Sequence, residues 1–92
     1  MKKKISQAII KFFKNENLII DESKLIIEKS KNFGDYSSNV ALMFAKQNKI
    51  DSLKLAQTIK NQLLSENLNL EKIEIAPPAL LIFLFPKMNM QI

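Results

Sequence analysis

The side chains of this 92-residue chain that could do chemistry are lysines, carboxylates and hydroxyls, because cysteine and histidine are both absent. Without cysteine there is no thiol nucleophile, disulfide scaffold or zinc ribbon. Without histidine the chain lacks the usual general base, a common metal ligand and the usual partner that activates a serine. The composition therefore argues against a catalytic site here and directs attention to binding.

Lysine dominates the charged residues: fourteen cations, all lysine, stand against nine carboxylates, for a formal net charge of +5. A basic balance favours anionic partners such as nucleic acid or a membrane surface. Lysine is a mobile point charge and lacks the rigid fork with which arginine reads phosphate and guanine. Binding should therefore be mostly electrostatic and weakly sequence-specific. The richness in Lys, Asn, Ile and Phe is also typical of an A+T-rich genome, which does not exclude binding.

Three stretches have the apolar spacing of amphipathic helices. The first covers residues 3–15 and carries lysines on its other face. The second should begin near Ser37 or Ser38, and the third at Asp51 or Ser52, because these side chains can cap a helix. The residues expected on the buried helical faces are Ile5, Ala8, Ile9, Phe12, Phe13, Val40, Ala41, Phe44, Ala45, Leu53, Ala56, Ile59 and Leu63.

Three stretches have strand patterns: residues 24–29, 71–76 and, after a Pro77-Pro78 turn, 80–85. The order helix, strand, helix, helix, strand, strand predicts a small two-layer α+β domain, with helices on one face of an antiparallel sheet. The tight turn predicts that the last two strands form an antiparallel pair. The expected core is Ile9, Phe13, Ile26, Val40, Phe44, Ala56, Ile59, Leu63, Ile73, Ile75, Leu81 and Phe83.

The most distinctive stretch is residues 33–42, Phe-Gly-Asp-Tyr-Ser-Ser-Asn-Val-Ala-Leu, which leads from an expected loop over 30–38 into a helix. Gly34 can adopt a positive φ, Asp35 can cap the helix, and the neighbouring aromatic side chains can anchor the loop on the core. One glycine is too few for a glycine-rich phosphate loop. The residues alone therefore indicate a capped helix start.

This stretch resembles the Phe-Gly-Asp-Tyr/Phe-x-x-Asn-x-Ala signature of the N-terminal additional domain of arginyl-tRNA synthetases. The matching motif residues are Phe33, Gly34, Asp35, Tyr36 and Asn39. Residues 46–64 are similar to the second long amphipathic segment of that family, and residues 71–85 to its hairpin. The resemblance covers residues 5–85, nearly the whole chain.

In that family the domain contacts the D-loop at the tRNA elbow. The resemblance therefore implies a tRNA-binding accessory domain, with a basic surface near the exposed side of the hairpin. Tyr36 can stack on a base. The other expected contacts are Pro78, Leu80 and Ile82 on the hairpin and, as phosphate contacts, the lysines Lys2, Lys3, Lys4, Lys46 and Lys49.

The hairpin departs from the family pattern, which typically reads Gly-Pro-Gly-aromatic-x-Asn-Phe. Pro77-Pro78-Ala79 replaces Gly-Pro-Gly, and Leu80 and Ile82 replace the aromatic residue and the asparagine. Neither Leu80 nor Ile82 can hydrogen-bond to a base, so contact by shape and apolar packing is expected. Because side chains alternate along a strand, we expect Leu80 and Ile82 to be substantially exposed, with Leu81 and Phe83 buried.

The family's catalytic domain carries a His-x-Gly-His motif for ATP, which a chain without histidine cannot contain. We therefore expect residues 1–86 to form the accessory domain and 87–92 a linker or tail toward an absent catalytic domain. The chain is then either an excised domain or a stand-alone relative. No cofactor is expected in it; ATP and magnesium belong to the resembled full-length enzyme, an arginine–tRNA ligase. The longest apolar run, 79–85, is too short to span a membrane, so we expect a cytoplasmic location.

Two other hypotheses stay open on the residues alone. The chain could be a protein-interaction or structural domain that docks through its apolar last strand. It could also bind a membrane surface through its lysine-rich first helix, although that helix is short and has no tryptophan. Binding assays with tRNA, pull-down experiments and liposome flotation would separate the three.

Overall fold

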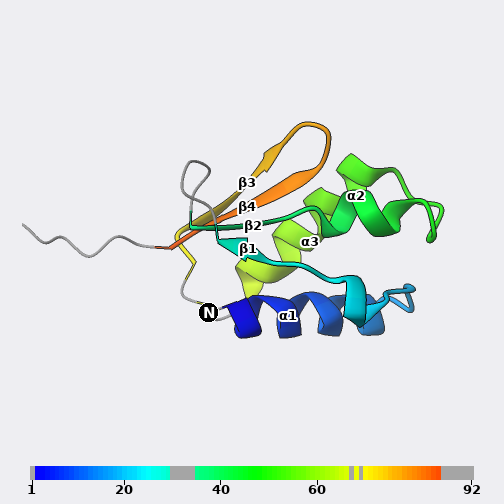
Figure 1. Ribbon diagram of the computed structural model, residues 1–92, viewed down its shortest axis with the longest axis horizontal. Helices are drawn as coiled ribbons and strands as arrows, with labels where there is room; N and C mark the ends of the chain where they lie inside the picture. The colour runs from blue at the N-terminus through cyan, green and yellow to red at the C-terminus, as the bar shows by residue number, and fades with distance from the viewer. Residues whose placement is uncertain (1, 30–34, 67, 69, 86–92) are drawn as a thin grey trace, which may run out of the picture.

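The computed structural model describes residues 2–29, 35–66, 68 and 70–85, which form three α-helices and a four-stranded sheet (Figure 1). The helices are α1 (Lys2–Asn15), α2 (Val40–Ala45) and α3 (Ser52–Ser65). The strands are β1 (Glu28–Lys29), β2 (Tyr36–Ser38), β3 (Lys72–Ala76) and β4 (Leu80–Leu84), and a 3₁₀ turn, η1 (Glu22–Lys24), precedes β1. The α+β class and the three expected helices are confirmed, but the predicted start of the second helix near Ser37 or Ser38 is wrong, because both residues belong to β2 and α2 begins at Val40.

The sheet has the strand order β1-β2-β4-β3, and every neighbouring pair is antiparallel. The predicted pairing of the last two strands is therefore confirmed. The strand predicted over 24–29 is wrong for most of its length, because only Glu28 and Lys29 pair with β2. β2 itself lies within the predicted loop, since its Tyr-Ser-Ser sequence has none of the apolar alternation that signals a strand.

The helices lie on one face of the sheet, as predicted. α3 packs against β3 and β4 on one side and against α1 on the other, while α2 contacts α3 and β4 (Figure 1). Cross-strand partners share a face. Ile73 lies opposite Phe83 and Ile75 opposite Leu81 on the face toward the helices. The buried core is Ile5, Ala8, Ile9, Phe12, Phe13, Ile27, Val40, Ala41, Phe44, Ala45, Leu55, Ala56, Ile59, Leu63, Ile73, Ala79, Leu81 and Phe83.

Three apolar positions differ from the prediction. Ile26 is 54% exposed, because residues 25–27 lie beside α1 outside the sheet and only Ile27 of this run is buried. Leu53 is 45% exposed in the first turn of α3, and Leu55 is buried in its place. Ile75 is only partly buried, although it packs against the core.

Helices α1 and α2 end in the same backbone motif. After α1, Leu18 N–H donates to the Phe13 carbonyl (2.8 Å) and Asn17 N–H to Lys14 (3.2 Å). After α2, Ile50 N–H donates to the Ala45 carbonyl (2.9 Å) and Lys49 N–H to Lys46 (3.1 Å). This Schellman pattern requires a left-handed residue, and Asn17 (φ 57°) and Lys49 (φ 56°) supply it. Asparagine tolerates that region, whereas most other residues with a Cβ lose about 1 kcal/mol there.

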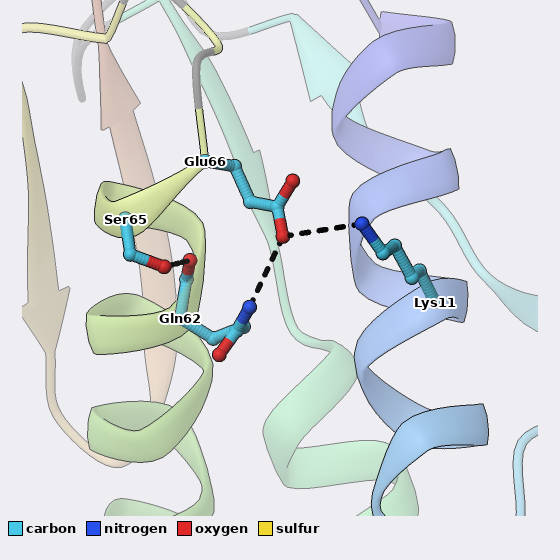
Figure 2. Close-up of polar contacts among 4 residues, drawn as sticks. All are labelled: Lys11, Gln62, Ser65 and Glu66. Carbon is cyan, nitrogen blue, oxygen red and sulfur yellow. Dashed lines mark hydrogen bonds and ion pairs between the residues drawn. The ribbon is translucent and has the colours of Figure 1, made fainter.

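The start and end of α3 are fixed by polar side chains. Asp51 caps the helix, as predicted, by accepting a hydrogen bond from Lys54 N–H (3.1 Å). At the other end, Figure 2 shows the Glu66 carboxylate between the two helices, where it accepts from Gln62 Nε2 (3.0 Å) and pairs with Lys11 Nζ of α1 (3.7 Å). The Lys11 side chain is 61% exposed, so this ion pair adds little beyond orientation.

Candidate nucleic-acid interface

Asp35, in the distinctive motif, joins two strands rather than capping a helix. Its carboxylate Oδ2 accepts from Phe85 N–H (2.8 Å), and its own N–H donates to the Phe83 carbonyl (3.0 Å). The prediction that Asp35 caps α2 is therefore wrong. It ties the start of β2 to the end of β4, fifty residues away. Phe33 and Gly34 lie outside the described residues.

Tyr36 belongs to the same junction. Its ring meets that of Phe85 edge to face, with centroids 5.8 Å apart, and it is half-buried against the core. The side chain is thus occupied within the protein, which reduces what it can offer a base. Asn39 is exposed at the N-cap position of α2 without a side-chain cap bond, and Ser38 Oγ accepts from Val40 N–H instead (3.2 Å).

The hairpin presents less apolar surface than predicted. Pro78 is exposed at its turn and Leu80 is half-buried, but Ile82 is only 7% exposed. The prediction that Ile82 is substantially exposed is therefore wrong. β4 is an inner strand, so Ile82 is flanked on the outer face by Ser37 of β2 and Glu74 of β3. Side chains directly across a ladder are about 5 Å apart and shelter one another.

The outer face of the hairpin is not basic. Its charged residues are Lys72 and Glu74, and the Lys72 ammonium pairs with Glu74 (3.1 Å). Glu28 of β1 adds a further carboxylate on the same face, because it lies opposite Ser37. Among the described residues, the outer face of the hairpin itself therefore does not provide the expected basic surface.

That surface occurs where α2 turns into α3, over residues 46–54, here called the α2–α3 corner. Lys46, Lys49 and Lys54 are all exposed, and none forms an ion pair within the described part of the chain. The corner carries a single carboxylate, Asp51, which is engaged in capping α3. Its local charge is therefore about +2 and is free to act on a ligand.

The backbone of the corner is held rigidly by Asn48. The Asn48 amide accepts from Ile19 N–H (2.6 Å) and donates to the carbonyls of Ile19 (2.9 Å) and Phe44 (2.9 Å). This side chain therefore fixes the turn to the connection that follows α1. The lysines project from a pre-organised platform, which limits the entropy lost when a ligand orders them.

The corner and the tip of the hairpin lie toward the same end of the molecule, to the right in Figure 1, while α1 starts toward the other end. Lys4, on the first turn of α1, is exposed but is separated from the sheet by α3. Of the other lysines on α1, Lys14 pairs with Glu22 (3.7 Å), and the side chain of Lys2 is not described. The corner that carries Lys46 and Lys49 therefore lies toward the same end as the hairpin tip, whereas the start of α1, with Lys4, lies toward the other end.

Comparison with known proteins now bears on this geometry. A family model described as the arginyl tRNA synthetase N terminal domain matches residues 1–83. The chain belongs to this family. The resemblance carried by the motif over residues 33–42 is thereby confirmed.

Relatives of this synthetase domain carry the name arginine–tRNA ligase. The chain is 92% identical over 87 residues to that of Mesomycoplasma hyopneumoniae strain 7448, covering 95% of the chain and 16% of the relative. It is 32% identical over 79 residues to that of Listeria monocytogenes serotype 4a, covering 86% of the chain and 14% of the relative. The chain therefore spans about a sixth of the length of these relatives.

Two residues of the synthetase domain's corner were not predicted to take part. Lys54 follows the Asp51 cap by three residues, and a lysine in a first helical turn has no sequence feature that marks it as a binding residue. Asn48 bonds to a segment twenty-nine residues away, which no local pattern reveals. Both became evident only from the way the chain folds.

Docking of a partner through the last strand receives less support. Both edges of β4 are paired, and Leu81, Ile82 and Phe83 are buried, so β4 offers a partner no free apolar strand. None of the helices in the described portion is long and apolar enough to cross a membrane. Across the same residues, no three acidic side chains gather as metal ligands would.

Proposed function

We propose that this chain is a tRNA-binding accessory domain of an arginine–tRNA ligase. It contacts the D-loop side of the tRNA elbow and supports the charging of arginine tRNA by a catalytic domain that is not in the chain. The observation that carries the proposal is the family match over residues 1–83, together with relatives named arginine–tRNA ligase. ATP and magnesium act in that catalytic domain, and the enzyme works in the cytoplasm.

The geometry favours two different kinds of RNA contact at one end of the molecule, apolar contact from the hairpin tip and phosphate contact from the α2–α3 corner. The hairpin tip contributes Pro78 and Leu80, which can pack against sugar or an unstacked base. The α2–α3 corner contributes Lys46 and Lys49, whose ammonium groups form no ion pair among the described residues and can attract phosphate. Ile82 acts indirectly in this arrangement, by supporting the hairpin from its buried position.

Fluorescence anisotropy with labelled tRNA tests the proposal. The chain should bind arginine tRNA weakly at low salt, because point-charge lysines supply most of the affinity. Unlabelled RNAs of unrelated sequence should displace it almost equally well, since neither Leu80 nor Ile82 can hydrogen-bond to a base. A chain that leaves the anisotropy of tRNA unchanged at low salt would contradict the proposal.

A further inference from the structure

Lys49 occupies a position that its residue type does not favour. Lys49 and Asn17 both have φ near +57° and sit at the same place in the same terminal motif, after α2 and α1 respectively. Glycine and asparagine suit this position because they tolerate a left-handed backbone, whereas the Cβ of lysine crowds the following carbonyl. A lysine held in such a conformation points to a role outside the local fold.

A local role for the Lys49 charge would be to neutralise the carbonyl end of α2. Those carbonyls already have partners. Ala45 and Lys46 accept from the backbone of Ile50 and Lys49 itself, and Phe44 accepts from the amide of Asn48. The Lys49 side chain is exposed and makes no ion pair among the described residues. Its charge is therefore available to a ligand.

We propose that Lys49 is the central phosphate-binding residue of the α2–α3 corner, with Lys46 and Lys54 beside it, and that it holds this place at the expense of fold stability. The inference rests on the proposed tRNA-binding function and identifies which surface takes the RNA backbone. The ligand class is a phosphodiester chain. Lysines fixed on a rigid turn bind successive phosphates without reading bases.

The variant Lys49→Gly separates stability from binding, because the two should move in opposite directions. Glycine relieves the left-handed backbone, so the melting temperature should rise by about 3–6 °C. Loss of one phosphate contact should weaken tRNA binding about three- to fivefold at low salt and reduce the slope of log K against log salt by about 0.7–0.9. Lys49→Gln, which keeps the backbone cost, should weaken binding equally without raising the melting temperature.

Asn17→Gly is the matched control. It makes the same backbone change at the equivalent position after α1 and removes no charge. It should shift the melting temperature by less than about 3 °C and leave tRNA affinity unchanged.

The outcomes separate the phosphate role of Lys49 from the proposed tRNA-binding function. If Lys49→Gly raises stability but Lys49→Gly and Lys49→Gln leave tRNA affinity and its salt slope unchanged, the phosphate role is wrong while the tRNA-binding function stands. If Lys49→Gly lowers the melting temperature, the lysine serves the fold and the inference is overturned. If the unaltered chain binds no tRNA, the proposed function and the inference fail together.

Discussion

The tip of the β3–β4 hairpin and the α2–α3 corner lie toward the same end of the molecule, yet the hairpin and the corner expose different chemistry. The hairpin carries one glutamate and one lysine, which pair with each other, and its apolar side chains are largely covered. The corner carries three lysines that pair with no carboxylate in the described part of the chain, on a turn fixed by Asn48. The family resemblance thus pointed to the hairpin. The lysines that pair with no described carboxylate, and that can attract RNA, lie on the α2–α3 corner instead.

The largest expected effect concerns the stability of the hairpin. Ile82→Asp places a carboxylate where only 7% of the side chain is exposed, so it should destabilise the fold by about 3 kcal/mol or more. Thermal unfolding followed by circular dichroism should show a melting temperature lower by more than about 10 °C. The control Leu64→Asp, at a residue 43% exposed on α3, should cost about 1 kcal/mol or less. Equal losses of stability in Ile82→Asp and Leu64→Asp would mean that the outer face of β4 is exposed to solvent.

The next effect concerns the base of the hairpin, where Asp35 accepts the Phe85 N–H. Asp35→Ala removes a partly buried acceptor and should cost about 1.5–2 kcal/mol. Hydrogen exchange at the Phe85 amide should accelerate, while tRNA affinity measured well below the melting temperature stays unchanged. Asp35→Asn keeps an acceptor oxygen and should lose less. If both variants stay folded and both lose much of their tRNA affinity, the RNA contacts the junction of Asp35 and Phe85 and not the hairpin tip.

Substitution of the corner lysines should change the affinity for tRNA and leave the stability of the fold nearly unchanged. The double variant Lys46→Gln/Lys49→Gln should weaken tRNA binding about tenfold at low salt and reduce the salt slope by about 1.5, because two phosphate contacts are lost. Lys3→Gln/Lys4→Gln removes the same charge from α1 and serves as the control, with less than about twofold change expected. Similar losses in both variants would indicate diffuse attraction by net charge and no dedicated corner.

The smallest effect is expected from the hairpin tip. Leu80→Ala should weaken tRNA binding about two- to threefold, because a half-buried side chain contributes limited apolar contact. The salt slope should stay the same, since no counterion is released by an apolar contact. A change in the salt slope for Leu80→Ala would contradict the expectation that the hairpin tip makes only apolar contact with the RNA.

Much of the fold could be predicted from periodicity. The spacing of Ile5, Ile9 and Phe13, and the Asp51 cap, located α1 and the start of α3, because both features are local. Ile26 could not be placed, since a run of three apolar residues does not say which of them faces inward. The burial of Ile82 depends on β2, a strand whose polar sequence gives no signal of its own.

The candidate site was predictable only in part, for the same reason. The excess of lysine indicated an anionic ligand and picked out Lys46 and Lys49, since composition and sequence position suffice for that. Asp35 was assigned to a helix cap because its real partner, Phe85, is fifty residues away. The left-handed backbone of Lys49 also depends on how α2 ends in three dimensions, so its cost became visible only in the structure.

If the lysines of this domain hold tRNA, the affinity for tRNA must fall as the salt concentration rises. Anisotropy titrations of the unaltered chain over a series of salt concentrations should give a slope of log K against log salt of about −2 to −3, as expected for about three phosphate contacts, one for each corner lysine. An affinity that stays the same between low and moderate salt would contradict the electrostatic account.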